Sequence, residues 1–363
     1  MLVGFCLSIS LYAIHALAVA VLIPSTNLVN VEKRGPVYGV FTGVTAPTWS
    51  DGGSWDLRYP FAPFWSIVFD WTISYPSIQS GDTFSLSLTN LFAVYTPGST
   101  YVKRDTTQTV SLAGPDGTVY ATCELIPATI VSVAELQCVG TNAIASGIDV
   151  SGSFTLEFVF NAGGSINNPD LQAAKSIVGA LNHLSFSDGV NNLPYDVTFV
   201  KGSPSISENP NHLVYADRPV PWANYDSIYV LGGSCNDDNG VTAGALGTLG
   251  ISSPSGNLDC SSYQVQVTKD LNDWYFPISS LEQEGISITC TKTAITVNYP
   301  FLKDNYRPFI AIDAHTSGEE FEIYFTNTYI CPNAPPHNGL VNYPPVTYDA
   351  TVTFDGSGSP PVK

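Results

Sequence analysis

The chain contains 363 residues, of which 44% are hydrophobic and 12% are charged, and its formal net charge is −18. This length accommodates two ordinary domains with packed cores. Because an acidic chain repels phosphate backbones, nucleic acid is excluded as a natural partner.

The amino-terminal segment is typical of a secretory signal peptide. No Lys, Arg, Asp or Glu occurs from Leu2 to Ala20, and the small residues Ala16, Ala18 and Ala20 fit the cleavage rule for such signals. We therefore predict a signal peptide at residues 1–20 and secretion of the remaining chain. A membrane anchor is the alternative, but polar residues interrupt the apolar run and turn-rich sequence follows it.

A dibasic pair, Lys33 and Arg34, precedes Gly35. Such a pair is a candidate site for a furin-like protease, which would make residues 21–34 a propeptide. A plain exposed charge pair is the equal alternative.

Hydrophobic and polar residues alternate in short runs along the rest of the chain. The clearest runs are Phe84–Leu88, Phe154–Phe158, Tyr195–Phe199, Tyr263–Val267 and Phe321–Phe325. One buried and one wet face per strand is typical of antiparallel sheet, and Gly, Asp, Asn and Pro turn signals separate the runs. A short helix is predicted at Pro169–Lys175. The pattern predicts an all-β fold of two antiparallel β-sandwiches.

The polar, proline-bearing stretch Gly202–Asn211 marks the expected boundary between the sandwiches. We predict a first domain at residues 35–201 and a second at residues 202–331. Residues 332–363 are rich in Pro, Asn and Gly. We expect them to form a tail that leads to a missing stalk, or a truncated end.

Cysteine use indicates disulfides rather than a metal site. Of the seven cysteines, Cys6 lies in the predicted signal. The others form no Cys-x-x-Cys pair and have no His at metal-ligand spacing, so zinc is not expected.

If each half folds by itself, Cys123 pairs with Cys138, and a loop of that size contributes roughly 3 kcal/mol. The four cysteines of the second half allow three connectivities. We favour Cys260–Cys290 nested inside Cys235–Cys331, because this ties the end of the second domain to its beginning.

No catalytic frame is visible in the sequence. It has neither a His-Glu-x-x-His motif nor a Gly-x-Ser-x-Gly elbow, and neither a P-loop nor a dinucleotide fingerprint. Asp237 and Asp238 do not match the spacing of an EF-hand, and turn formation beside a disulfide explains them better than calcium does. We expect no enzyme activity, no cofactor and no metal.

One loop region combines aromatic residues, prolines and Arg58. Core packing accounts for Trp65 in this region. For Trp55, Tyr59 and Phe61 an aromatic-lined binding groove is an equal alternative.

Several further segments carry a family resemblance. They are Gly39–Val44, Thr48–Ser50, Gly81–Phe84, Tyr120–Cys123, Lys269–Pro277, Tyr306–Ile310 and Tyr324–Cys331. From Gly35 to Cys331 the chain resembles, in order, the N-terminal region of the fungal agglutinin-like sequence adhesins. The resemblance implies two immunoglobulin-like domains in tandem. It also implies a cavity between them that binds flexible peptide C-termini of many proteins.

The resemblance also implies where a ligand would lie. In the family the peptide extends beside a strand of the second domain, which corresponds to Phe321–Tyr329, and a buried lysine neutralises its terminal carboxylate. That lysine is replaced here by Ala93. The expected ligand-binding residues are Trp55 and Arg58 of the aromatic loop, together with Phe92, Ala93, Asp217, Phe276, Glu322, Tyr324, Thr326 and Thr328.

A carboxylate buried without a partner costs several kcal/mol, so a different cation must serve or the ligand does not end there. The candidate cations are Arg58, Lys103, Arg104, Arg218 and Arg307, and Arg58 is preferred because it lies in the aromatic loop.

Two positions that form an additional disulfide in the family correspond to Asn90 and Ser176, so both of its cysteines are absent together. The remaining six match the family's pairing. That pairing is Cys123–Cys138, Cys235–Cys331 and Cys260–Cys290.

Two functional hypotheses follow. The first is a cell-surface adhesin head that binds extended peptide segments or C-termini of host or partner-cell proteins by strand addition, and so mediates adhesion or aggregation. The alternative is a secreted glycan-binding or glycan-active β-sandwich protein, and a purely structural wall protein is a third possibility. We expect secretion, attachment to the cell wall if an anchored stalk follows, no membrane insertion of the head, and homotypic association as a further partner mode.

Overall fold

The computed structural model describes residues 34–49, 58–61, 65–97, 108–126, 128, 132–202, 213–220, 225–236, 242–243, 245–302, 305–315, 321–331 and 346–354. The predicted signal peptide, most of the predicted propeptide, Trp55, Lys103 and Arg104 lie outside these residues. Residues Gly35–Lys363 form one compact unit by their contacts. The predicted domain boundaries stay predictions.

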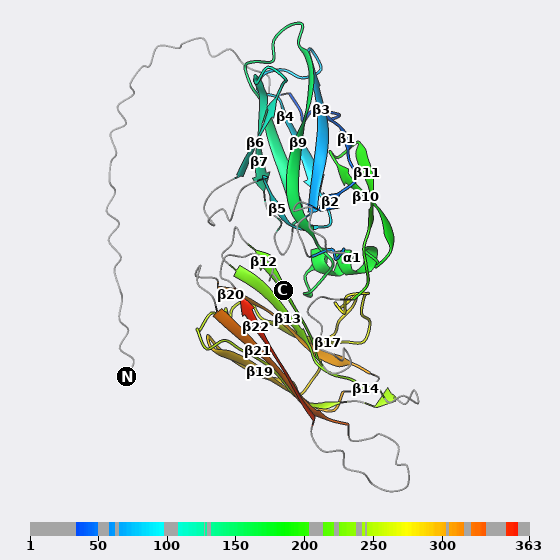
Figure 1. Ribbon diagram of the computed structural model, residues 1–363, viewed down its shortest axis with the longest axis vertical. Coiled ribbons are helices and arrows are strands. Elements are labelled where there is room, and N and C mark those ends of the chain that lie inside the picture. The colour runs from blue at the N-terminus through cyan, green and yellow to red at the C-terminus, as the bar shows by residue number, and fades with distance from the viewer. Residues whose placement is uncertain are drawn as a thin grey trace, which may run out of the picture. The chain divides into compact units, whose positions relative to one another are not determined.

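The first half of the chain folds into two facing antiparallel sheets (Figure 1). One sheet has the order β1 (Phe41–Val44), β3 (Trp65–Ser74), β9 (Asp149–Phe160), β5 (Leu91–Tyr95), and β2 (Thr48–Trp49) also pairs with β3. The other has the order β11 (Asn192–Thr198), β10 (Leu181–Ser187), β4 (Thr83–Leu88), β8 (Ala134–Gly140), β7 (Val119–Ile126), β6 (Gln108–Ala113). The helix α1 (Asn168–Ser176) follows β9, as the sequence predicted.

Alternation along the strands creates the first core. In β3 every second side chain from Trp65 to Ile73 is buried, and Phe84, Leu86 and Leu88 of β4 are buried in the same cluster. Cys123 and Cys138 lie opposite each other on β7 and β8 and form a disulfide. The apolar period of two in the sequence therefore becomes the interior of a sandwich.

The second half forms another sandwich. Its first sheet has the order β12 (Val214–Val220), β13 (Tyr225–Leu231), β20 (Arg307–His315), β17 (Gln264–Thr268). Its second has the order β18 (Ser287–Thr291), β19 (Ala294–Tyr299), β16 (Leu246–Ser252), β21 (Phe321–Ile330), β22 (Val346–Phe354). A small ladder joins β14 (Cys235–Asn236) and β15 (Thr242–Ala243). The disulfides Cys235–Cys331 and Cys260–Cys290 form as expected.

The sheet that contains β12 and β13 is buried on both faces. Tyr229 and Leu231 belong to the core of the first sandwich, whereas Ile228 and Val230 belong to the core of the second. The hydroxyl of Tyr229 also donates a hydrogen bond to the carbonyl of Tyr275 at 2.9 Å. The near-continuous apolar run Ile228–Leu231 is thus explained by two apolar neighbours rather than one.

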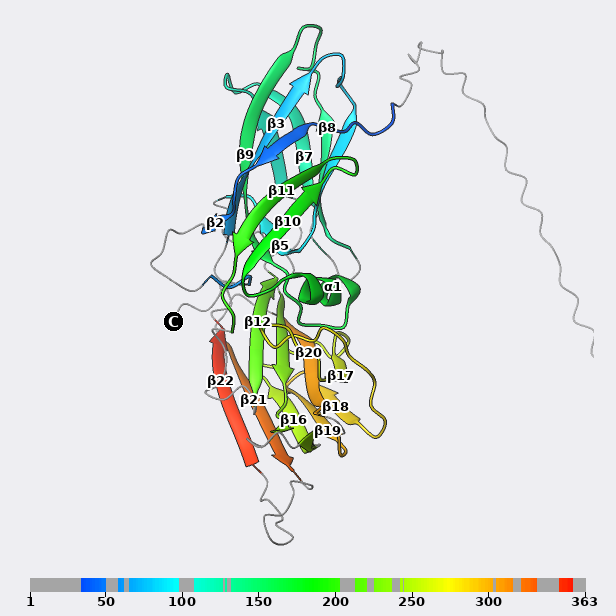
Figure 2. The same cartoon turned by 90° about the vertical axis from the view of Figure 1, so that its right-hand side faces the viewer.

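The strand β22 was not predicted. It lies at the edge of its sheet beside β21 (Figure 2), and the antiparallel register runs from Phe321 opposite Phe354 to Tyr329 opposite Val346. The tail predicted at residues 332–363 therefore includes an ordered strand. The all-β, two-sandwich fold with three disulfides is confirmed.

Candidate ligand-binding cavity

Both sandwiches contribute to a cavity of about 890 Å³. Its lining comes from the start of β5, from α1 and the loop before it, and from β12, β13, β17 and β20. Twelve of the 24 lining residues carry an amide or an aliphatic hydroxyl, and the others include the aromatic residues Phe92, Tyr225 and Tyr263 and six aliphatic residues. A cavity of this size lies within the usual range for ligand sites.

Arg218 anchors the floor of this cavity. Its side chain is 3% exposed, and its Nη2 lies 3.1 Å from Oδ2 of Asp170. Its Nη1 donates to the carbonyl oxygen of Gly163, and the guanidinium lies 4.1 Å from the centre of the Phe92 ring. A side chain at Gly164 would place its Cβ 2.8 Å from Cζ of Arg218, so this close approach requires glycine.

Asp170 is held for this pairing by its own neighbours. It lies in the first turn of α1, where the partial positive charge of the helix terminus favours a carboxylate. The amide of Asn161 donates to Asp170 Oδ1 at 2.8 Å, and the Asn161 side-chain oxygen accepts from the backbone of Gly163 at 2.9 Å. Arg218 and Asp170 thus form an ion pair within the protein.

Gln264 connects the opposite wall to the loop before α1. Its side-chain oxygen accepts from the backbone N–H of Ile166 at 2.9 Å, and its Nε2 donates to Asn167 Oδ1 at 3.0 Å. These bonds join β17 of the second sandwich to the first sandwich beside the cavity.

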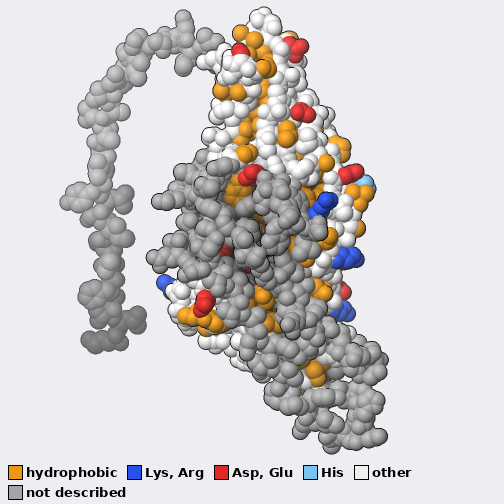
Figure 3. Space-filling model, viewed as in Figure 1, with side chains coloured by type: hydrophobic (Ala, Val, Ile, Leu, Met, Phe, Trp, Pro, Cys, Tyr) orange, Lys and Arg blue, Asp and Glu red, His pale blue; other side chains and the backbone are white. Residues whose placement is uncertain are grey.

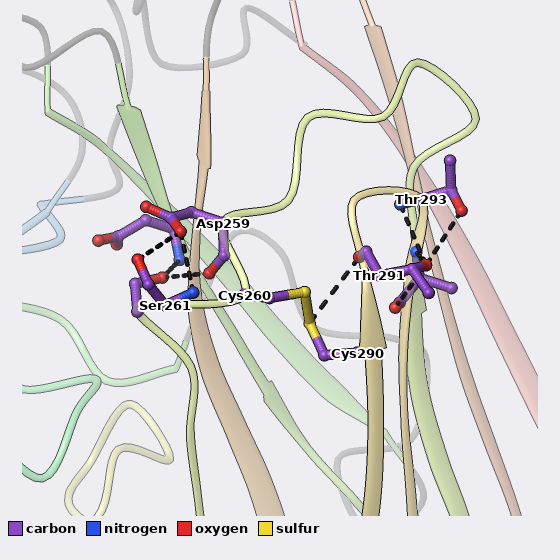
Figure 4. The surroundings of a disulfide bond; sticks show 9 residues. Asp259, Cys260, Ser261, Cys290, Thr291 and Thr293 are labelled. Carbon is purple, nitrogen blue, oxygen red and sulfur yellow. Dashed lines mark hydrogen bonds between the residues drawn. A yellow bond between two sulfur atoms is a disulfide. The ribbon is translucent and has the colours of Figure 1, made fainter.

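The loop that carries Ser261, Ser262 and Tyr263 is fixed covalently and by hydrogen bonds (Figure 4). Cys260 is tied to Cys290 at its base, and Ser261 Oγ donates to Asp259 Oδ1 at 2.6 Å. The loop also joins β20, because the N–H of Asp313 donates to Ser262 Oγ at 2.8 Å. This wall of the cavity is therefore preorganised.

Asp313 is the other charged group of the lining. It is partly exposed on β20, and burial raises the pKa of its carboxyl above the usual value while the positive charge of Arg218 and a hydrogen bond from Ser227 lower it. Within the described part of the chain, the charged lining residues are Asp170, Arg218 and Asp313.

The predicted site residues separate into several places. Phe92 lines the cavity, whereas Ala93 is fully buried in a small cluster with Tyr95 and Val159. Phe276 is also fully buried, in the first core, with its ring 5.9 Å from the Arg218 guanidinium. Trp55 lies outside the described residues.

Asp217 and the β21 residues lie away from the cavity lining. Asp217 is next to Arg218 on β12, so its side chain points to the opposite face of the sheet, and burial raises the pKa of its carboxyl to about 6. The half-buried or exposed side chains on one face of β21 are Glu322, Tyr324, Thr326 and Thr328. The Tyr324 hydroxyl donates to the Glu322 carboxylate.

The expected strand addition along Phe321–Tyr329 needs correction. β16 pairs with one side of β21 and β22 pairs with the other, so β22 occupies the edge along which a foreign strand would lie. By contrast, β5 and β17 end the strand order of their sheets, and both contribute to the cavity lining. These two edges border the cavity, although Val267 of β17 already exchanges backbone hydrogen bonds with Leu281.

The candidate cations are also separated. Arg58 is exposed, and its carbonyl accepts from the N–H of Val200. Arg307 is buried, and its Nε donates to the carbonyl of Gly232. Burial of the guanidinium lowers the pKa of Arg307 to about 10. Of the candidates that the structure describes, Arg218 is the one that lines the cavity.

Sequence patterns did not identify the polar lining. Asn161, Gln264 and Asp313 come from segments far apart in the chain and belong to no motif. Asn90, which the resemblance matched to a lost cysteine, also lines the cavity and has a positive φ of 62°. The described residues contain no group of three or more His, Cys, Asp or Glu side chains arranged to hold a metal ion.

Two sandwiches that share a preorganised cavity define a β-sandwich binding module. The sequence model of the family described as "Agglutinin-like protein, N-terminal domain" matches residues 70–331. The chain belongs to this agglutinin-like family.

Curated relatives agree with this assignment. Agglutinin-like protein 1 of Candida albicans is 32% identical over 306 residues, which cover 83% of this chain and 23% of that protein. Agglutinin-like protein 3 of the same organism is 30% identical over 308 residues, which cover 83% of this chain and 26% of that protein. The chain therefore spans about a quarter of the length of these relatives.

Solved structures give more distant likenesses. The serine-rich repeat adhesion glycoprotein from Streptococcus agalactiae has a TM-score of 0.42 at 13% identity, covering 79% of this chain and 92% of that chain. The collagen adhesin from S. aureus has a TM-score of 0.35 at 12% identity, covering 88% and 96%. These likenesses carry no argument about function.

Proposed function

We propose that this chain is the head of a cell-surface adhesin that binds extended peptide segments or C-termini of extracellular or partner-cell proteins. The observation that carries the proposal is the cavity framed by both sandwiches of a member of the agglutinin-like family. Binding without catalysis and location in the cell wall belong to the same proposal, as does homotypic association through a peptide segment of a second copy.

The lining suits a peptide backbone. An extended chain presents an N–H and a C=O at every residue, and each needs a hydrogen-bond partner once it is removed from water. Amides and hydroxyls of the cavity offer donors and acceptors, and Phe92, Tyr225 and Tyr263 offer apolar contact for alternate side chains. Pairing with the edge of β5 or β17 would add main-chain hydrogen bonds.

The small number of charged residues in the described lining also favours short-range recognition. Among the residues drawn in colour in Figure 3, charged side chains are few beside the polar and apolar ones. Specificity in such a setting depends on hydrogen bonds and shape more than on long-range attraction. Among the described residues, the structure contains no helix long and apolar enough to cross a membrane.

A steric block tests the proposal. Gln172 is exposed on α1 and lines the cavity, so Gln172→Trp should fill part of it at little cost to the fold. Leu181→Trp is the matched control, because Leu181 is 51% exposed on β10 and is not a lining residue.

The two variants and the original protein would be applied to a peptide array and a glycan array. We expect peptide binding that Gln172→Trp weakens at least tenfold and Leu181→Trp leaves unchanged. Binding to glycans alone, hydrolysis of a glycan, or peptide binding insensitive to Gln172→Trp would contradict the proposal.

A further inference from the structure

We propose that the cavity selects peptide segments that carry a positive group, a lysine or arginine side chain or a free amino terminus, bound at Asp313, and that it rejects a terminal carboxylate. This inference rests on the proposed function and specifies the ligand of the same site. It reverses the charge preference that the family resemblance implies.

The charge of the lining is the first argument. Arg218 is the positive side chain of the described lining, and its guanidinium already binds Asp170 Oδ2 and the Gly163 carbonyl and covers the Phe92 ring. The described lining carries two carboxylates, Asp170 and Asp313, against the single guanidinium of Arg218, which interacts with both, so one negative charge is left in excess. An incoming carboxylate would meet a like charge in a partly desolvated site, which is unfavourable.

The position of the lost lysine supports the same conclusion. Ala93 is fully buried against Tyr95 and Val159, so its methyl group offers no charge to a ligand. Arg58 is not among the lining residues, and Arg307 is buried and engaged with Gly232. Within the described chain, no cation of the candidate set is available to a bound carboxylate.

Asp313 is placed to receive a cation. It is partly exposed at the cavity wall, its carboxylate accepts a hydrogen bond from Ser227, and no ion pair of this carboxylate is found among the described residues. Its backbone is held on both sides, because its N–H donates to Ser262 Oγ and its carbonyl accepts from the N–H of Asp259 at 2.8 Å. The carboxylate therefore needs little reorganisation to bind a ligand.

Aromatic rings of the lining add to this preference. Tyr225 and Tyr263 both line the cavity, and the Tyr225 ring packs against His315 with ring centres 4.4 Å apart and the ring planes tilted by 41°. An ammonium or guanidinium group near such rings gains a cation–π interaction, whereas a carboxylate does not.

The test uses four fluorescent peptides with one neutral, extended core sequence. One is blocked at both ends, one is blocked and has a central lysine, one has a free amino terminus, and one has a free carboxyl terminus. Binding would be measured by fluorescence polarisation at low and physiological salt. We expect the lysine and free-amine peptides to bind at least about tenfold more tightly than the blocked neutral peptide, and the free-carboxylate peptide to bind more weakly.

Asp313→Asn should remove the preference for the lysine peptide over the blocked neutral peptide. Circular dichroism and thermal unfolding of the variant would show separately that it is folded. Asp196→Asn is the control. Asp196 is exposed on β11, so this substitution removes the same charge at a position away from the cavity. It should preserve the preference and so exclude an effect of net charge alone.

The preference should also decline as the pH falls toward 4, because Asp313 becomes protonated, and Asp313→Asn should abolish this dependence. The charged and titratable groups facing Asp313 are Arg218, Asp259 and His315. A pH dependence that persists in Asp313→Asn would contradict the assignment.

The outcomes separate the two proposals. Equal binding of neutral and lysine peptides, or tightest binding of the free-carboxylate peptide, would overturn the inference while the proposed function stands. Failure of every peptide to bind while glycans bind would overturn the proposed function.

Discussion

The buried ion pair between Arg218 and Asp170 provides the strongest test of how the two sandwiches are joined. The side chains are 3% and 10% exposed, and the pair links β12 of the second sandwich to α1 of the first. Removing one partner of a buried pair leaves an uncompensated charge and typically costs about 3–5 kcal/mol.

For Asp170→Asn we expect a loss of about 3 kcal/mol, at the low end of this range, because asparagine still offers one oxygen to Arg218 and Asn161. Scanning calorimetry would measure it as a fall in Tm of about 6 °C or more. The double variant Asp170→Asn with Arg218→Met should recover much of that loss, since neither charge then remains buried.

A second ion pair serves as the control. Lys201 and Asp273 also connect the two halves, at 3.0 Å, but the lysine side chain is 67% exposed. Solvent screening should hold the effect of Lys201→Met below about 1 kcal/mol. If Asp170→Asn destabilised no more than Lys201→Met, or if the double variant were no more stable than Asp170→Asn, the role assigned to this buried pair would be wrong.

Two further predictions concern stability. Burial raises the folded-state pKa of Asp217 from 3.8 to about 6. Its ionised carboxylate therefore lowers the free energy of unfolding at pH 7, and stability should rise as the pH falls from 7 to 4. Asp217→Asn should therefore stabilise the protein at pH 7 by about 1–3 kcal/mol and flatten this dependence in denaturant titrations, and a neutral or negative effect at pH 7 would contradict the burial argument. Removing the Cys235–Cys331 disulfide, which closes 96 residues, should cost about 4–5 kcal/mol by chain entropy, against roughly 3 kcal/mol for Cys123–Cys138, which closes 15. Paired Cys→Ala variants compared by thermal unfolding would check the order, and the reverse order would refute the chain-entropy account.

The sequence predicted most of the fold because its signals were local. Alternation in Phe84–Leu88, Tyr195–Phe199 and Phe321–Phe325 corresponds to β4, β11 and β21, and the three disulfides form as predicted. The helix predicted at 169–175 occurs as α1. Period-two burial and cysteine count need no knowledge of distant contacts.

The tail shows where local composition misled. The Pro-, Asn- and Gly-rich composition of residues 332–363 predicted a tail without a strand. Within it, however, apolar residues alternate with polar ones through Val346–Phe354. The alternation was a usable signal. Its partner could not be predicted from the segment itself, because pairing with β21 depends on the register between two strands.

The candidate site was the least predictable part. Phe92 and Arg218 were both named from the sequence, but nothing in the sequence placed them in contact or paired Arg218 with Asp170. Asp313 carried no signal, because a single aspartate in an apolar strand has several explanations. Such a site arises from the packing of two sandwiches, which is a long-range property.

The order of strands and disulfides along the chain divides the second sandwich into two mechanical parts. The covalent ring closed by Cys235 and Cys331 encircles β16, β18, β19 and β21, whereas β22 follows the last cysteine and is the strand of its described sheet that lies outside the ring. Tension applied beyond Phe354 would reach the Phe354–Phe321 rung first and could peel β22 away with every covalent cross-link intact. The exposed edge of β21 would then be able to pair with a strand from another molecule.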